Sequence, residues 1–172
     1  MKECEKDSKE NITLSISMTN GKCAVGENVG EECLKNNNVP VLSCEGACIR
    51  GEIARLAANY VSKHKNFKRG CHGELFTVPN SKIAQWILNA EKVVCIDGCF
   101  LKCHSRILEN MIEPSKLFVF DALSHYNKYN NIFDIDGVPE VERKEVAENV
   151  AQWVLKSIEE NKILTNNSSC CK

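Results

Sequence analysis

The sequence predicts an α/β fold of three layers, in which a mostly parallel sheet carries helices on both faces, as in Rossmann-like and flavodoxin-like proteins. Short apolar runs rich in Val and Ile recur along the chain, and such runs are typical of buried parallel strands. Longer segments between them place apolar residues every three or four positions, which favours helices with one buried face. Strands that alternate with helices in this way form parallel sheets.

The alternating elements begin at Val39. Strands are expected at residues 39–43, 74–78, 93–97 and 117–123, and a loop is expected at residues 124–136. Helices are expected after Cys48, from Asn80 or Ser81 to Ala90, after Gly98, and from Pro139 onward. Pro139 suits the first turn of a helix, because the N–H that proline lacks has no partner there.

The chain divides into an extension, a domain and a tail. Residues 39–164 are predicted to form a single α/β domain, since this length suffices for one core. In the N-terminal extension, residues 1–38, apolar and polar residues alternate from 12 to 18 and the turn Asn20-Gly21 follows, which predicts a β-hairpin. A loop is expected at residues 26–38, and the tail 165–172 is expected to be disordered.

Charge and hydropathy exclude several classes of protein. The formal net charge of −1 gives no support for nucleic acid or an anionic membrane as a partner. No apolar run approaches the ~18 residues that a membrane span needs. The first residues carry acids where a signal peptide has a basic region, and no apolar core follows them. A cytoplasmic protein is therefore expected.

The eleven cysteines are many for such a protein. Disulfides are rare in the cytosol, so a set of this size indicates metal binding or thiol chemistry. The number is also odd, which argues against a closed disulfide framework. Some of these cysteines are expected to be ordinary core residues, and Cys95, in the middle of a predicted strand, is one of them.

One cysteine pattern occurs twice. Cys44 and Cys48 follow one predicted strand, Cys99 and Cys103 follow another, and each pair precedes a helix. Residues four apart share a helix face, so each pair is expected to present two sulfurs side by side. If the two strands are neighbours, their ends lie about 5 Å apart and the four sulfurs meet at the carboxyl end of the sheet. Cys71, in a Gly-Cys-His-Gly loop, is expected to reach the same end.

Four converging thiolates repel one another unless a cation lies between them. Helix N-termini favour thiolates, and zinc binds four of them tetrahedrally. Soft thiolates also suit Cu(I) or an iron–sulfur cluster. The sequence thus favours a metal site, with zinc as the first choice and an iron–sulfur cluster as the alternative. Independent structural or redox thiols are the other interpretation.

The residues around Asp97 also resemble a known family. Residues 96–103 read Ile-Asp-Gly-Cys-x-Leu-x-Cys. They are preceded by Cys44-x-Gly46 and by Gly51 at a helix start, with Cys71 in between. Together these residues resemble the DGC family over roughly residues 39–125. That family is named for the Asp-Gly-Cys motif and is described as zinc-binding because its cysteines recur. The resemblance implies no particular reaction.

The resemblance also implies a ligand set and shows two departures. Phe100 stands where members often have Pro, and Ile107 stands where they tend to have a further Cys, so the ligand count and the metal can differ here. The ligands implied are Cys44, Cys99 and Cys103, followed by Cys71 and Cys48.

Two other functions remain open. Cys44 and Arg50 fit Cys-x5-Arg, a pattern that resembles low-molecular-weight tyrosine phosphatases and arsenate reductases, in which a thiolate attacks an oxyanion held by Arg and loop amides. Glu45 argues against this function, because its charge would repel phosphate. A dithiol redox protein is the third hypothesis, weakened by the absence of Cys-x-x-Cys. Whether the protein is an enzyme stays undecided.

Three polar residues stand beside the candidate ligands. His72 and His104 each follow a candidate cysteine, and either can be a fourth ligand or a hydrogen-bonding neighbour. Adjacent residues rarely point the same way, which favours the second role. Asp97 is expected to cap the helix that follows it.

Overall fold

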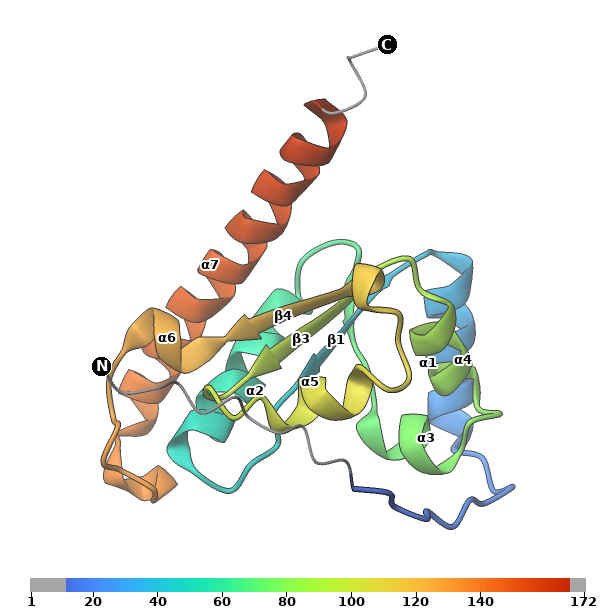
Figure 1. The fold of residues 1–172 in the computed structure, drawn as a ribbon, viewed down its shortest axis with the longest axis horizontal. Coiled ribbons are helices and arrows are strands. Elements are labelled where there is room, and N and C mark those ends of the chain that lie inside the picture. The colour runs from blue at the N-terminus through green and yellow to red at the C-terminus, as the bar shows by residue number, and fades with distance from the viewer. Residues whose placement is uncertain (1–11, 168–172) are drawn as a thin grey trace, which may run out of the picture.

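The computed structural model describes residues 12–167, with side chains to residue 160 (Figure 1). Its sheet has four strands in the order β2-β1-β3-β4, and every neighbouring pair is parallel. The strands are β1 (Val39–Ser43), β2 (Phe67–Arg69), β3 (Val93–Asp97) and β4 (Leu117–Asp121). The predicted three-layer α/β fold is confirmed.

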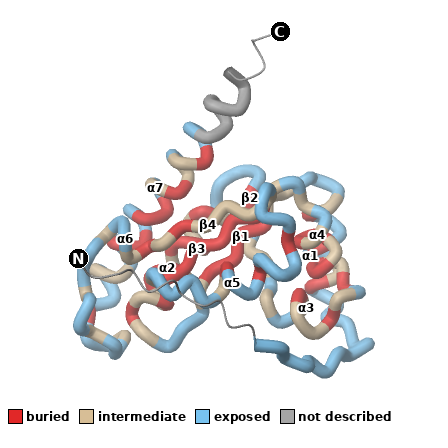
Figure 2. Tube along the Cα trace, viewed as in Figure 1, coloured by how far each residue is buried: buried red, intermediate tan, exposed pale blue. Residues whose placement is uncertain are grey.

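Helices cover both faces of this sheet. They are α1 (Ala24–Lys35), α2 (Ile49–Val61), α3 (His72–Thr77), α4 (Lys82–Asn89), α5 (Cys103–Leu108), α6 (Ala122–Tyr126) and α7 (Glu140–Asn167). One buried cluster joins α2 and α7 to the sheet, and a second joins α1, α3, α4 and α5 to its other face. Figure 2 shows the buried residues concentrated in the strands and on the inner sides of these helices.

The central strands explain why the two faces differ. Val41 and Ile96 point into the cluster with α2 and α7, whereas Leu42 and Cys95 point into the cluster with α4. Successive side chains of a strand point to opposite faces, so a strand covered on both sides must be apolar throughout. The predicted bounds of β1 and β3 are confirmed for this reason, and Cys95 is a core residue as expected.

Two predicted helices also match the structure. Ser81 is the N-cap of α4, where its Oγ accepts the N–H of Ala84 at 3.1 Å. The last helix buries an apolar stripe at a spacing of four residues, which keeps the stripe on one face. The buried residues of this stripe are Val146, Val150, Val154 and Ile158.

The predicted N-terminal hairpin and the loop after it are wrong. None of the described residues before Val39 lies in a strand, and α1 covers most of the expected loop. Glycines made this segment resemble a loop, but they allow close packing of α1 on α4. A Cβ on Gly30 would lie 2.4 Å from the backbone nitrogen of Ile83. This contact between distant segments offsets the low helix propensity of glycine.

The expected strand at residues 74–78 is also wrong. This segment lies in helix α3 and the residue that follows it, and the missing strand is β2, which holds one buried residue, Phe67. An edge strand of three residues carries no apolar run, so sequence periodicity does not reveal it. The Leu-Phe-Thr-Val segment buries only Leu75 and Val78, which is compatible with a short helix and its end.

The ends of two further elements differ from the expectation. The strand expected at residues 117–123 ends at Asp121, whose carboxylate accepts the N–H of Ser124 at 3.3 Å and caps α6. Helix α6 therefore takes the first part of the expected loop. Helix α7 runs to Asn167, so the first three residues of the expected tail, 165–167, belong to a helix. The rest of that tail, residues 168–172, and residues 1–11 lie outside the described residues. Within residues 12–167, no helix combines the length and apolar character needed to cross a membrane.

Candidate functional site

The two strands that carry the cysteine pairs are neighbours in the sheet. β1 pairs with β3 in parallel, with Ser43 opposite Ile96. The N–H of Cys44 continues this ladder by donating to the Ile96 carbonyl at 2.9 Å. Cys44 and Cys99 therefore leave the same, carboxyl end of the sheet, as the sequence predicts. Ligand sites of parallel α/β sheets lie at this end.

Three glycines hold the loops after these strands in direct contact. A Cβ on Gly98 would lie 2.8 Å from the carbonyl oxygen of Arg50, and a Cβ on Gly51 would lie 2.3 Å from that of Gly46. Real Cβ atoms do not approach backbone so closely. Any other residue at Gly98 would push the turn after β3 away from α2, and any other residue at Gly51 would push the loop after β1 away from α2. The glycines thus bring the backbone after β3 onto the start of α2.

Three of the five candidate cysteines lie at helix starts. Cys48 is the N-cap residue of α2. The side chains of Cys44, Cys48 and Cys99 are half-buried. Cys103, the first residue of α5, and Cys71, the N-cap residue of α3, are exposed. None of these five side chains forms a disulfide in the described part of the chain.

The prediction that each cysteine pair shares one helical face is wrong. α2 begins at Ile49, one residue after Cys48, and α5 begins at Cys103, so that Cys99 lies in the turn before α5. Lys102 causes the late start of α5, because its φ of 50° is left-handed and cannot belong to a right-handed helix. The sulfurs can meet only across loops, not along a helix.

Asp97 fixes the start of α5. This residue is 1 % exposed, and its two carboxylate oxygens accept the N–H groups of His104 at 3.1 Å and Ser105 at 3.4 Å. The predicted capping role is confirmed, although the cap comes from the end of β3 rather than from the residue next to the helix. Asp97 thereby ties Cys103 to the strand end.

Several acidic groups act on the thiol of Cys103. Burial raises the pKa of its thiol. The neighbouring thiols of Cys44 and Cys99 raise this pKa further, as does the carboxylate of Asp97. These groups are all acidic, so each opposes ionisation of the next. A cation among them would reverse this effect.

Cys48 joins the same neighbourhood through Tyr126. Burial raises the pKa of the Tyr126 hydroxyl, and Cys48 and Cys99 are among the nearby groups that raise it further. The hydroxyl oxygen is buried and has no hydrogen-bond partner in the described part of the chain. Tyr126 was not singled out from the sequence, where it lies in a polar segment expected to be loop.

His72 and His104 form a contact that the sequence does not reveal. Their rings meet edge to face with centroids 4.8 Å apart. Burial lowers the pKa of His72 to about 4, and His104 and Arg69 lower it as well. This contact brings the start of α3, which Cys71 precedes, next to the start of α5.

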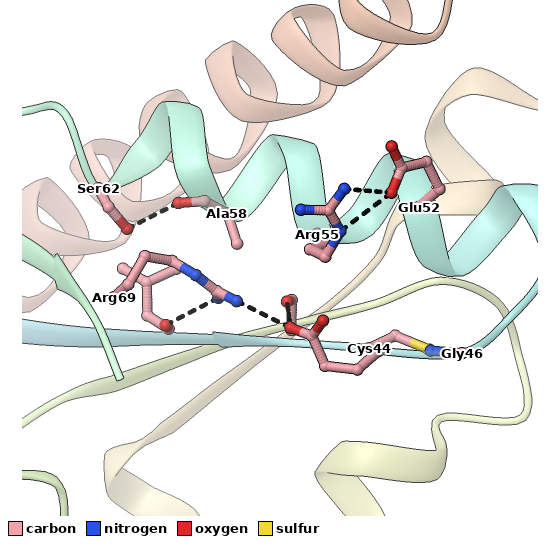
Figure 3. A network of polar contacts seen from close by, with 10 residues as sticks. Cys44, Gly46, Glu52, Arg55, Ala58, Ser62 and Arg69 are labelled. Atoms are coloured by element: carbon pink, nitrogen blue, oxygen red, sulfur yellow. Dashed lines mark hydrogen bonds and ion pairs between the residues drawn. The ribbon is translucent and has the colours of Figure 1, made fainter. Parts of the chain in front are cut away.

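The carboxylate of Glu45 is held by Arg69 and Ser43. It accepts hydrogen bonds from Arg69 at 2.8 Å and from the Ser43 hydroxyl at 2.9 Å, while Cys44 Sγ accepts the N–H of Gly46 at 3.4 Å (Figure 3). Arg69 also donates to the Val41 carbonyl, which anchors the ion pair to β1. The negative charge of Glu45 is therefore compensated within the sheet.

The donor atoms of this region suit zinc, although their positions do not yet form a site. Over the described residues, no group of three or more His, Cys, Asp or Glu side chains is already arranged to hold a metal ion. Thiolate sulfur and imidazole nitrogen are nevertheless the ligands that zinc prefers. Cys71 and Cys103 are exposed, which leaves their side chains room to reorient.

A family model for the DGC domain matches residues 40–152. The chain belongs to the DGC domain family. The match covers more than half of the 172 residues and extends from β1 into α7. It confirms the resemblance of the Asp-Gly-Cys segment, and the matched region includes all five candidate cysteines. Neither the curated proteins nor the solved structures gave a match.

Proposed function

We propose that the DGC domain binds one zinc ion through thiolates at the carboxyl end of the sheet. The candidate ligands are Cys44, Cys48, Cys99 and Cys103, with Cys71 as a possible substitute. The pairing of β1 with β3 carries this proposal, because it places Cys44 and Cys99 at one strand end. The contact between the two loops at Gly51 and Gly98 adds further support.

The electrostatics of the cluster favour a cation. The pKa of Cys103 is raised, first by burial and then by its acidic neighbours, and a bound cation would lower it. Zinc binds thiolates and releases their protons. Binding is therefore expected to draw the exposed Cys103 side chain toward Cys44 and Cys99. An all-thiolate zinc has no open position, so we expect the ion to stabilise the loops rather than to catalyse a reaction.

We also propose that the protein resides in the cytosol. The eight cysteines that the structure describes are all free. Free thiols and thiolate metal sites persist in a reducing compartment.

Anaerobic purification followed by elemental analysis tests the metal. We expect a colourless protein with about one zinc per chain, and we expect Cys99→Ser to lose most of it. Cys23→Ser is the matched control, because Cys23 is an exposed thiol at the start of α1 and not a candidate ligand. A brown protein with charge-transfer absorption would instead indicate an iron–sulfur cluster. Metal-free protein that loses two thiols on mild oxidation would indicate dithiol redox chemistry.

Oxyanion chemistry at Cys44 and Arg50 is a second candidate function. The ion pair of Glu45 with Arg69 favours it, because this pair compensates the charge that would otherwise repel phosphate. The Nε of Arg50 is also buried without a hydrogen-bond partner among the described residues. Phosphatase or arsenate reductase turnover that Cys44→Ser abolishes and Cys99→Ser preserves would support this function over zinc binding.

A further inference from the structure

Two imidazole nitrogens at the carboxyl end of the sheet have no hydrogen-bond partner in the described part of the chain. They are Nε2 of His72, in the first turn of α3, and Nδ1 of His104, in the first turn of α5. Both atoms are buried, and the two rings pack against each other at 4.8 Å between centroids. The orphan nitrogens thus belong to one contact between two helix starts, not to separate places on the surface.

An unpartnered buried nitrogen is unfavourable. Leaving a buried polar group without its hydrogen bond costs about 1–3 kcal/mol. For packing alone, an apolar ring would be more favourable than a histidine. Phe76 is such a ring, and it also contacts His72, with centroids 5.8 Å apart. Two such nitrogens in one contact therefore call for a ligand that satisfies both.

The chemistry of imidazole indicates what that ligand is. A neutral imidazole keeps one nitrogen lone pair free to accept a proton or to bind a metal. The nearest candidate ligands in the chain, Cys71 and Cys103, are the residues directly before the two histidines.

We infer that Nε2 of His72 and Nδ1 of His104 are ligands of the zinc ion, and that thiolates of the cysteine cluster complete a mixed nitrogen and sulfur site. This inference rests on the proposed zinc-binding function and specifies its ligands. The centroid distance of 4.8 Å is short enough for one ion to bind both rings, since zinc–nitrogen bonds are about 2.0–2.1 Å long.

A mixed site also agrees with the electrostatics of the thiols. Four thiolates on one zinc ion leave a net charge of −2, whereas two thiolates and two neutral imidazoles leave the site neutral. The second arrangement avoids part of the repulsion among the sulfurs. The buried carboxylate of Asp97, which accepts the N–H of His104 next to Cys103, would add to that repulsion.

X-ray absorption at the zinc edge of the full-length, zinc-loaded protein tests the inference directly. We expect imidazole scattering from two nitrogens together with a sulfur shell. A shell of four sulfurs without imidazole would overturn this inference and leave zinc binding by thiolates intact. Wild-type protein that holds no zinc would overturn both the inference and the proposed function.

Variants give a second readout. His72→Phe and His104→Phe keep an aromatic ring in the contact and remove the nitrogen. Each is expected to weaken zinc binding at least about tenfold, measured by competition with a chromogenic chelator. Each is also expected to shift the visible absorption of the cobalt-substituted protein. His64→Phe is the control, because His64 follows α2, is exposed, and lies outside the candidate site.

A purely structural role for the histidines predicts a different result. If the rings only pack, the phenylalanine variants will bind zinc and cobalt as the wild type does, and this outcome would overturn the inference. Thermal unfolding of the metal-free variants shows whether each one folds. Replacement of an unpaired buried nitrogen by carbon is expected to leave that stability unchanged or higher.

Discussion

The cysteines of this protein differ in how deeply they are buried, and burial affects how readily a cysteine forms a thiolate. Burial raises the pKa of Cys33, and it raises the pKa of Cys95 to a greater extent, with Asp97 and Cys44 contributing. Cys23 and Cys71, in contrast, are exposed. Since the thiolate is the reactive form, position in the fold and not sequence spacing decides which cysteines react.

Alkylation of the native, metal-free protein should follow this order. Iodoacetamide at pH 8 is expected to label Cys23 and Cys71 first and to leave Cys33 and Cys95 unmodified, as measured by peptide mass spectrometry over time. A raised pKa means less thiolate at a given pH, so labelling of the two buried cysteines should require higher pH or unfolding. Labelling of Cys95 as fast as Cys23 would contradict the buried position of Cys95.

Removal of the Asp97 charge tests its role in positioning α5. Asp97→Asn keeps the size of the side chain but replaces one of two acceptors, so one of the N–H groups of His104 and Ser105 loses its partner. We expect a loss of about 1–3 kcal/mol in the free energy of unfolding of the metal-free protein, measured with urea. Asp121→Asn is the control, because Asp121 caps α6 at a more exposed position. If both variants lose the same free energy of unfolding, the burial of Asp97 does not make its hydrogen bonds more important for stability than those of Asp121.

Residue-level prediction from the sequence succeeds where the signal is local. Asp97 follows an apolar run and precedes a helix, and its capping role is recognisable from that position. The contact of His72 with His104 depends on how α3 and α5 approach each other, and no local pattern encodes that approach. The ion pair of Glu45 with Arg69 was missed for the same reason.

At the scale of elements, the loops after β1 and β3 lie against the start of α2 because glycine permits it. Gly51 lies inside α2, where alanine would normally favour the helix by about 1 kcal/mol. A Cβ there would instead meet the backbone of Gly46. The site therefore depends on the absence of side chains as much as on the cysteines.

Gly51→Ala should reverse the usual effect of alanine in a helix. We expect a loss of about 1–3 kcal/mol in the free energy of unfolding, together with weaker zinc binding, because the loop after β1 must move away from the start of α2. Gly73→Ala, in α3, is the matched control, since the Cβ would meet only Cys71 Sγ at 3.8 Å. Thermal unfolding of both variants checks this prediction. Stabilisation by Gly51→Ala would contradict the close contact of the loops.

Element prediction depends on how completely an element is buried. β1 and β3 lie in the middle of the sheet, so their continuous apolar runs reveal them. β2 lies at the edge, is three residues long and buries only Phe67, which leaves almost no pattern. Helix α1 was missed because its glycines resemble loop, while its stability comes from packing on α4.

For the whole molecule, the order of strands decides where the chemistry lies. The order β2-β1-β3-β4 places the two cysteine-bearing strands side by side at the centre, with the strand end of β4 next to them. The sequence alone does not show that these two strands are neighbours, because the alternation of strands and helices does not determine strand order. The metal that we propose for this arrangement follows from donor chemistry, which the sequence already indicates.

Zinc should stabilise the folded domain as a whole. A ligand that binds only the folded state adds about 2.7 kcal/mol at a free concentration of 100 times its Kd. We therefore expect removal of zinc by a chelator to lower the Tm of wild-type protein and of Cys23→Ser, and to have little effect on Cys99→Ser. A Tm that is the same with and without zinc in the wild type would show that the ion does not bind the fold.

An anomalous difference map at the zinc edge, from crystals of the zinc-loaded protein, is the most direct measurement of the central claim. We predict one peak beyond the ends of β1 and β3, within bonding distance of Sγ of Cys44 and Sγ of Cys99. A peak at another part of the molecule, or a map without a peak in a crystal that holds both loops in place, would contradict the account.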